Sequence, residues 1–525
     1  MFSLYRVSAL LVLVAAVMLG SVFVPACNDP RNSTHARVPM ESINKGKELA
    51  GRYCNSCHAL PDPSWLDAGT WENGVMPVMG PFLGIHQFNY KDYPSWRFDH
   101  LLEEQPYPAQ PLLSREEWGS VIDYYTSLSP DKLEGQKKEV PIQLDLKQFT
   151  IEIPKSLYTQ AATSFIKIRP PGSQHALLIS DAFRSKTFFL NASGELKDSL
   201  AASGPYVDIA FDEKNWVVCN IGRLDPNNGR FGKAEQVVIG KDGKGEENSA
   251  PLLDSLRRPV QVTPADFNGD GRMDYLVCEF GFIAGSLMWM EGTGSGFRRH
   301  IIKALPGAIK AYVRDENSDG RPDIWVLFTQ GREGVYLYTN KGNGVFAEKE
   351  VLAFPPVYGS SFFELVDVNK DGLQDVVYTC GDNADYSTVL KPYHGVYVFV
   401  NKGGNRMEQS YFYPVNGCYK ALARDYDGDG DVDIATISYF ADYAAQPEES
   451  FVYFENTGAL AFQPRSMKES SVGRWLTMDA GDLDGDGDID LVLGSFFMGP
   501  TIIKSKVDWA ASPPFIVLRN RGKKR

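Results

Sequence analysis

The segment RYCNSCHALP, residues 52–61, places two cysteines and a histidine in the spacing CxxCH. Two thiols at this spacing can form thioether bonds to the vinyl groups of one porphyrin, and the histidine that follows can ligate its iron. A structural zinc site is the alternative for such a cluster, but no second Cys/His pair at suitable spacing follows. We therefore predict that Cys54 and Cys57 attach haem c covalently and that His58 is an axial iron ligand.

Two helices are predicted to position this segment. Gly46, Leu49 and Tyr53 recur at intervals of three and four residues, which indicates a helix leading into CxxCH. A second helix is predicted in LSREEWGSVIDYYTSLSP, where Ser114 and Glu117 have the spacing of a capping box. The apolar face of this second helix consists of Trp118, Val121, Ile122 and Tyr125. Pro130 is predicted to end it.

This arrangement resembles the c-type cytochromes, and the resemblance implies a small all-α haem domain over residues 40–130. WENGVMPVMGPFLG is similar to the ligand loop of bacterial fusion cytochromes with a Met-Gly pair, which implies Met79 as the second axial ligand. Met76 is the alternative thioether, and His86 or His100 would give a bis-histidine haem of lower potential. The short separation of His58 from Met79, 20 residues, departs from the common cytochrome pattern.

The first 27 residues predict export. One positive charge at Arg6 precedes an apolar run that ends in Val24-Pro25-Ala26-Cys27, which resembles a lipobox with Cys27 as the acylated residue. An uncleaved membrane anchor is the alternative. Either way, the rest of the chain is expected in the periplasm or at the cell surface, as an outer-membrane lipoprotein if the lipobox is used. Haem attachment of this type requires such a location.

From about residue 150 onwards the chain is repetitive, and from Asp266 it contains five copies of one acidic loop, at intervals of 49 to 58 residues. Each copy reads D-x-[DN]-x-D-G-x-x-D and is followed by a strand-like run such as IWVLF. Oxygens at positions 1, 3, 5 and 9 of such a turn can converge on one ion, and glycine at position 6 permits the sharp bend. The predicted calcium ligands are Asp266, Asn268, Asp270, Asp274, Asp315, Asn317, Asp319, Asp323, Asp367, Asn369, Asp371, Asp375, Asp425, Asp427, Asp429, Asp433, Asp482, Asp484, Asp486 and Asp490.

An EF-hand has similar spacing but does not fit. Position 12 is Val277 in the first copy and Leu493 in the last, where an EF-hand needs a bidentate glutamate, and strands rather than helices follow. Acidic turns without metal are the other alternative, but carboxylates held this close repel each other strongly without a cation. We expect calcium to stabilise turns between strands and to take no part in chemistry.

The five copies resemble the FG-GAP or VCBS repeats of integrin-type β-propellers, in which each unit of this length is a four-stranded blade. Two weaker units precede them, SFIKIRPPGSQHALLISDAF and YVDIAFDEKNWVVCNIG, and PPFIVLRN near the C-terminus completes the last. The resemblance therefore implies an all-β seven-bladed propeller over residues 149–525, joined by a charged linker, residues 131–148, to the haem domain. Each of Cys219, Cys278, Cys380 and Cys418 is either a small buried residue or half of a disulfide.

No nucleophile elbow, phosphate loop or zinc-protease helix is present, so electron transfer to a redox partner protein is the favoured function. The formal charge of −13 argues against nucleic acid as a partner. Residues of the propeller loops that would suit carbohydrate recognition are Asp382, Asp385, Tyr439, Asp442 and Tyr443. Lys310 and Lys420 share one register, five residues before a metal-ligating aspartate, and are candidates to point into the central channel. For each of these residues, surface-loop or blade packing is the alternative. An oxidoreductase, such as a sugar dehydrogenase whose haem accepts substrate electrons, and an adhesion module are the alternatives.

Overall fold

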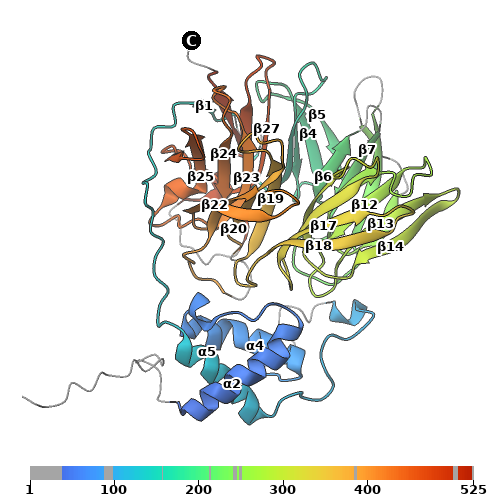
Figure 1. The fold of residues 1–525 in the computed structure, drawn as a ribbon. Coiled ribbons are helices and arrows are strands. Elements are labelled where there is room, and N and C mark those ends of the chain that lie inside the picture. Colours follow the sequence, from blue (N-terminus) through green and yellow to red (C-terminus); the bar gives the residue numbers. More distant parts are fainter. Residues whose placement is uncertain are drawn as a thin grey trace, which may run out of the picture.

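The computed structural model describes residues 38–87, 98–155, 158–211, 215–239, 245–247, 251–382, 387–499 and 507–522. The predicted signal, with the lipidation site Cys27, lies outside these residues, as does Asp385. Within the described part, no helix has the length and apolarity that a membrane span requires. Helices fill the N-terminal part and strands the remainder (Figure 1).

The strands form seven antiparallel sheets, and these sheets are the blades of a β-propeller. The seven-bladed propeller predicted from the repeats is confirmed, and the two weaker units form blades 1 and 2. Blades 1 to 3 consist of β2 (Thr163–Ile168), β3 (Leu177–Asp181), β4 (Lys186–Leu190) and β5 (Leu196–Ala201); β6 (Tyr206–Phe211), β7 (Asn215–Asn220), β8 (Gly232–Ile239), β9 (Gly245–Glu247) and β10 (Leu253–Leu256); and β11 (Pro259–Ala265), β12 (Asp274–Glu279), β13 (Ser286–Thr293) and β14 (Gly296–Lys303). Blades 4 to 6 consist of β15 (Ala308–Arg314), β16 (Asp323–Phe328), β17 (Gly334–Asn340) and β18 (Phe346–Ala353); β19 (Ser360–Val366), β20 (Asp375–Cys380), β21 (Gly395–Asn401) and β22 (Met407–Pro414); and β23 (Cys418–Arg424), β24 (Asp433–Ser438), β25 (Phe451–Asn456) and β26 (Phe462–Arg465). Blade 7 consists of β27 (Trp475–Gly481), β28 (Asp490–Ser495), β29 (Phe515–Asn520) and β1 (Phe149–Glu152).

Burial follows strand position within each blade. In blades 3 to 7 every residue of the second strand is buried, because both faces of that strand pack against neighbouring sheets. The fourth strand, for example β18, is largely exposed. A strand that is buried on both faces needs apolar residues at successive positions, which explains why continuous apolar runs such as IWVLF form second strands. The four cysteines of the propeller are buried and unpaired, and so act as small core residues; they are Cys219, Cys278, Cys380 and Cys418.

The ring closes by pairing the two ends of the propeller sequence. β1, from the start of the propeller, is the outermost strand of blade 7 and pairs with β29 from its end, with Phe149 opposite Asn520. PPFIVLRN does complete the last blade, but as its third strand. Phe149 is 1% exposed and lies in a core that joins blades 6 and 7.

Phe149→Ala should destabilise the propeller by about 3–5 kcal/mol, because the substitution leaves a cavity at the closure. Equilibrium unfolding in urea measures this loss. Ile153→Ala is the matched control, since Ile153 lies just beyond β1 and is 51% exposed. Equal effects of the two substitutions would contradict closure through β1.

Polar contacts between first strands join neighbouring blades around the centre of the ring. The side chains of Asp479 and Gln261 accept hydrogen bonds from the backbone N–H groups of Ile168 (2.8 Å) and Ala311 (2.8 Å) in the next blade. Glu364 accepts from the N–H of Ala423 in the same way, at 2.7 Å. Because all three carboxylate or amide oxygens are satisfied by backbone donors, they hold the ring together at little desolvation cost.

The N-terminal region is a set of helices around a small apolar core. Its helices are α2 (Met40–Tyr53), α3 (Ala68–Thr70), α4 (Met76–Met79) and α5 (Arg115–Leu128), with 3₁₀ turns at Cys54–Ser56, Pro63–Trp65, Gly80–Leu83 and Asp99–Leu101 and a π-helical turn at Trp71–Val75; further 3₁₀ turns in the propeller are Pro447–Ser450 and Trp509–Ala511. α2 crosses α5 where Gly46 lies so close to Ser120 that a Cβ atom would clash with its carbonyl oxygen. The capping box of Ser114 and Glu117 is present at the start of α5. The assignment of this region as a cytochrome c domain stays a prediction.

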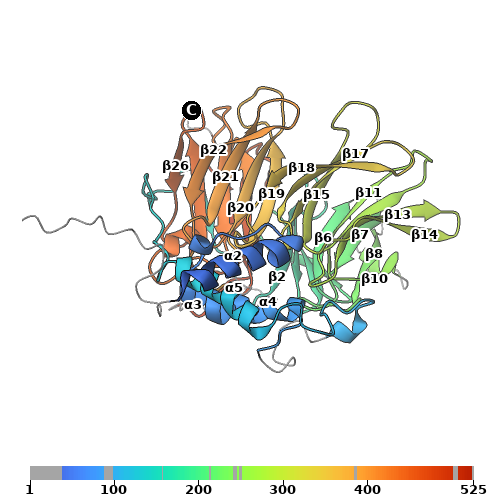
Figure 2. The same cartoon turned by 60° about the horizontal axis from the view of Figure 1, so that its bottom comes forward.

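The helices and the acidic loops lie on opposite faces of the ring. Figures 1 and 2 both place α2 and α5 against one face of the propeller. That face is built from the turns between second and third strands and between blades: Asn228 donates to Asp99 (2.8 Å), and Tyr393 donates to the carbonyl oxygen of Trp65 (3.0 Å). The acidic loops join first to second strands. Since consecutive turns of an antiparallel sheet alternate between its two ends, these loops must lie on the other face.

Residues 131–148 run along the side of the propeller (Figure 1). Lys138 forms an ion pair with the buried carboxylate of Glu449 in blade 6. Further along, the backbone N–H groups of Gln143 and Leu146 donate to residues at the edge of the same blade. The predicted linker is therefore fastened to the propeller over much of its length.

Candidate functional sites

The CxxCH segment begins where α2 ends. Cys54 opens the 3₁₀ turn after Tyr53 and is partly buried, whereas Cys57 is exposed. Burial, and then the neighbouring Cys57, raises the pKa of the Cys54 thiol to about 11. Nδ1 of His58 lies 2.8 Å from the carbonyl oxygen of Ala59, so Nδ1 must carry the proton. In the neutral ring with this tautomer, the other nitrogen, Nε2, carries the free lone pair that can ligate a metal.

The four predicted candidates for a second axial ligand differ in burial. Met76 is 3% exposed and belongs to the apolar core of the helical region. Met79, at the end of α4, is partly exposed and packs against this core from its margin, as Cys54 does. His86 and His100 are exposed. Met79 therefore shares the edge of one apolar core with the CxxCH segment, whereas Met76 is enclosed.

The same core contains an unpaired donor and is partly covered by the propeller. Nε1 of Trp118 is buried and has no hydrogen-bond partner among the described residues. Val357, from the connection between blades 4 and 5, and Val389, from a turn of blade 5, pack against the core. In blade 4, a Cβ atom on Gly331 would lie 3.8 Å from the carbonyl oxygen of Cys57. One side of the CxxCH segment therefore faces propeller rather than solvent.

The five acidic loops share one backbone geometry. In each, the position 1 aspartate accepts a hydrogen bond from the N–H of the position 6 glycine; for example, Gly320 donates to Asp315 at 2.7 Å and Gly430 to Asp425 at 3.0 Å. These glycines have positive φ, +80° for Gly320 and +97° for Gly430, which only glycine adopts without strain. The glycine in the repeat is thus required by the turn, as predicted.

The position 9 aspartates are buried, with exposures of 0 or 1%; they are Asp274, Asp323, Asp375, Asp433 and Asp490. Each connects its loop to the third strand of the blade. In the first loop, Oδ2 of Asp274 accepts from the N–H of Phe267 (2.9 Å) and Oδ1 from that of Gly292 (2.7 Å). Each oxygen retains a second lone pair, so this bracing role is compatible with metal ligation.

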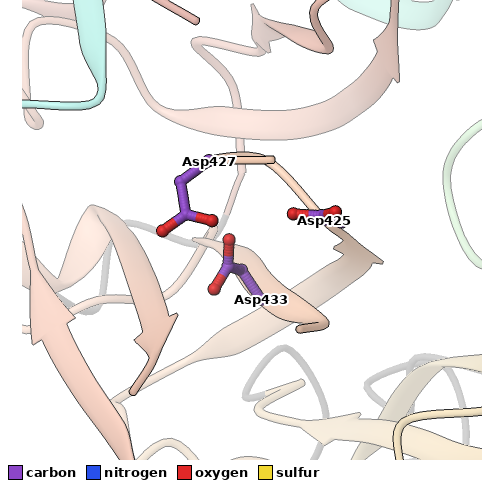
Figure 3. Close-up of side chains that lie close together, drawn as sticks. All are labelled: Asp425, Asp427 and Asp433. Carbon is purple, nitrogen blue, oxygen red and sulfur yellow. The ribbon is translucent and has the colours of Figure 1, made fainter. Parts of the chain in front are cut away.

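Two of the loops bring three carboxylates together. In loop 425–433, oxygens of Asp425, Asp427 and Asp433 lie within 4.8 Å of one another (Figure 3). In loop 482–490 the group is Asp482, Asp484 and Asp486, at positions 1, 3 and 5 rather than 1, 3 and 9. Carboxylate oxygens at this separation are a donor set for a hard cation such as Ca²⁺.

Electrostatics in loop 425–433 disfavours the ionised carboxylates when no cation is present. Burial, with a contribution from Asp427, raises the pKa of Asp433 to about 7. Burial and then the charges of Asp429 and Asp425 raise the pKa of Asp427. A bound divalent cation would favour the ionised forms and lower both pKa values.

The predicted ligand-binding residues of the propeller loops are mostly engaged in packing. Tyr439 and Tyr443 are 6% and 7% exposed, and the Tyr443 hydroxyl donates to the Ser438 carbonyl oxygen. Asp442 accepts from the N–H of Ala445. Lys310 and Lys420 occupy equivalent positions on β15 and β23, and Lys420 donates to the carbonyl oxygen of Met478 (2.8 Å). Burial lowers the pKa of Lys420 to about 8.

Basic residues beside the acidic loops were missed by the sequence reasoning. Arg272 and Arg321 occupy position 7 of the first two loops and pair with the position 5 aspartate. Their identical place in the repeat was a usable signal. Arg519, on β29, pairs with Asp490. No local signal connects these two residues, since the fold alone brings β29 beside the last loop.

Residues 315–378, which span the second and third acidic loops, match the family model of the FG-GAP-like repeat. Together with the sheets described above, this match defines the class of protein: a seven-bladed β-propeller that contains FG-GAP-like repeats. No curated protein sequence matches the chain.

Two similar solved structures both contain Nup159. One is the N-terminal domain of Nup159, with 9% identity, covering 73% of this chain and 98% of that one, at a TM-score of 0.40. The other is S. cerevisiae Dbp5 bound to Nup159 and Gle1, with 9% identity, covering 74% and 100%, at a TM-score of 0.41. Similarity at this level carries no argument about function.

Proposed function

We propose that the protein is an exported monohaem c-type cytochrome that transfers single electrons to or from a redox partner protein, and that its propeller binds a partner or substrate. Export is inferred from the N-terminal residues, and attachment to the outer membrane through lipidated Cys27 is part of the proposal. The propeller with FG-GAP-like repeats fits a binding module.

The hydrogen bond made by His58 is the observation that carries the haem proposal. The hydrogen bond from Nδ1 to the Ala59 carbonyl oxygen fixes the ring and leaves Nε2 as a ligand. This histidine directly follows two free cysteines, one at the margin of an apolar core and one exposed. That donor set fits covalently attached haem, which supplies one-electron chemistry at its iron when bound.

The remaining residues have supporting roles in this proposal. Cys54 and Cys57 would tether the porphyrin, and the thioether of Met79 would be the second protein ligand of its iron. The unpaired N–H of Trp118 can donate to an acceptor on the bound group, which would remove the cost of leaving a buried donor unsatisfied. The turns of blades 4 and 5 exclude water from the side of the CxxCH segment that they cover.

Met79→Ala and Met76→Ala should have different effects. Met79→Ala should remove the absorption feature of the sulfur–iron bond from the oxidised spectrum and lower the reduction potential, because the thioether ligand is lost. Met76→Ala should retain that feature but destabilise the helical region by about 2–5 kcal/mol, since Met76 lies in its core. Absorption spectra and urea unfolding separate the two. If only Met76→Ala removed the sulfur–iron feature, Met76 would be the iron ligand and Met79 would not.

Redox titration tests the proposed activity. Haem that is reduced by partner proteins but not by candidate carbohydrates supports electron transfer. Direct reduction by a carbohydrate would instead support the oxidoreductase alternative, and haem that neither donates nor accepts electrons would contradict both.

A further inference from the structure

Arginine side chains already neutralise part of the acidic charge in three of the five loops. In loop 266–274, the guanidinium of Arg272 pairs with Asp270, and its Nε donates to the carbonyl oxygen of Gly292 on β13 at 2.9 Å. Loop 315–323 repeats this geometry: Arg321 pairs with Asp319, and its Nε donates to the carbonyl oxygen of Asn340 at 3.1 Å. In both loops a cation occupies the position 5 carboxylate, which is a predicted calcium ligand.

Loop 482–490 receives its arginine from another strand. Nη1 of Arg519 lies 2.9 Å from Asp490 and 3.3 Å from Asp484, the carboxylates at positions 9 and 3. Its Nη2 also donates to Glu152 of β1 and to the carbonyl oxygen of Ala192 in blade 1. Arg519 therefore joins the closure of the ring to the last acidic loop, and its charge offsets part of that loop's acidic charge.

Loop 425–433 has a different arrangement. Among the described residues, its ligand positions form no ion pair with lysine or arginine, which is also true of loop 367–375. Lys370 pairs instead with Asp431, at position 7, although its charge also acts on Asp429 and Asp425. Oδ1 of Asp425 is buried and has no hydrogen-bond partner in the described part of the chain. The equivalent oxygens of Asp266, Asp367 and Asp482 each accept a backbone N–H. A buried carboxylate oxygen without a hydrogen-bond donor is a candidate ligand for a cation.

We propose that loop 425–433 is the principal calcium site of the propeller, and that Arg272, Arg321 and Arg519 are built-in counter-ions that weaken calcium binding in their own loops. This proposal rests on the calcium binding expected of the repeats. A guanidinium in the coordination shell repels Ca²⁺ and must give up charge-assisted hydrogen bonds before the carboxylate can turn to the ion. The arginines would thus keep three turns folded whether or not calcium is present.

The proposal ranks the loops by calcium affinity, with loop 425–433 first. Titration of decalcified full-length protein with calcium alone tests this order. Isothermal calorimetry should show one site filling before the others. Asp425→Asn should abolish this first event, whereas Asp266→Asn, the same change at position 1 of a loop with an arginine, should leave it intact. Circular dichroism in excess calcium establishes that both variants are folded.

A gain of affinity gives a second, independent test. Arg272→Gln should tighten calcium binding in loop 266–274 by roughly ten-fold, since ligand charge sets the affinity of such sites. Arg299→Gln is the matched control, because Arg299 is exposed on β14 of the same blade and its replacement removes the same charge. Five sites of equal affinity, or no gain with Arg272→Gln, would overturn the ranking but leave calcium binding in place. No calcium binding at all would overturn both.

Discussion

Replacing Cys57 with alanine is expected to remove most of the covalently bound haem from the protein. The exposed Cys57 thiol is the more reactive of the pair, whereas burial raises the pKa of Cys54 to about 11 and so suppresses its thiolate form. With only the less reactive thiol left, attachment should be inefficient, and what remains should have a single thioether bond. Haem staining of denatured protein, with a pyridine haemochrome spectrum for the number of thioethers, measures both effects.

The control for this prediction is another cysteine. Cys380→Ala removes a thiol that is buried in blade 5, far along the chain from the CxxCH segment. It should change the stability of the blade but not the haem content. Normal covalent haem in Cys57→Ala, or a colourless wild-type protein, would refute the haem proposal.

Removal of calcium is expected to lower the free energy of unfolding of the propeller. A site that is filled at about a thousand times its dissociation constant adds about 4 kcal/mol to the free energy of unfolding. At about 2 °C per kcal/mol for a large domain, chelation should lower the melting temperature by about 8 °C, and by more if several loops bind. Thermal unfolding in calcium and in EGTA measures the difference.

Asp429→Ala links this stabilisation to a loop. Asp429 is at position 5 of loop 425–433, so its replacement should lower the melting temperature in calcium but change it little in EGTA. The control Asp254→Ala removes an exposed aspartate that lies outside the acidic loops, and should have no effect in either condition. A melting temperature that is insensitive to EGTA would show that calcium does not stabilise the turns.

Local features of this chain could be predicted because their physical causes are local. The capping box at Ser114 and Glu117 depends on hydrogen bonds between residues three positions apart. The turn around Gly320 requires a positive φ angle, and the glycine at position 6 of each repeat indicates this in the sequence. Burial of second strands followed from apolar runs with no alternation.

Residue spacing could not distinguish Met79 from Met76 as the predicted iron ligand. Both methionines lie in one short segment, and spacing alone favours neither as an iron ligand. Their difference in burial arises only when α2 and α5 pack against that segment and enclose Met76 in the core. Similarly, Tyr439 and Tyr443 have the composition of a binding loop, but packing of their blade buries both rings.

By itself, the sequence determined the repeat count, the strand-turn-strand unit, the acidic loops and the CxxCH pattern, because each depends on interactions within a few residues. Only the tertiary structure decided that β1 closes the ring beside β29, that the helices and the acidic loops lie on opposite faces, and that Arg519 reaches the last loop. These features join residues that are hundreds of positions apart or belong to different strands. Their positions follow from closing seven twisted sheets into a ring, a constraint that no local stretch of the chain contains.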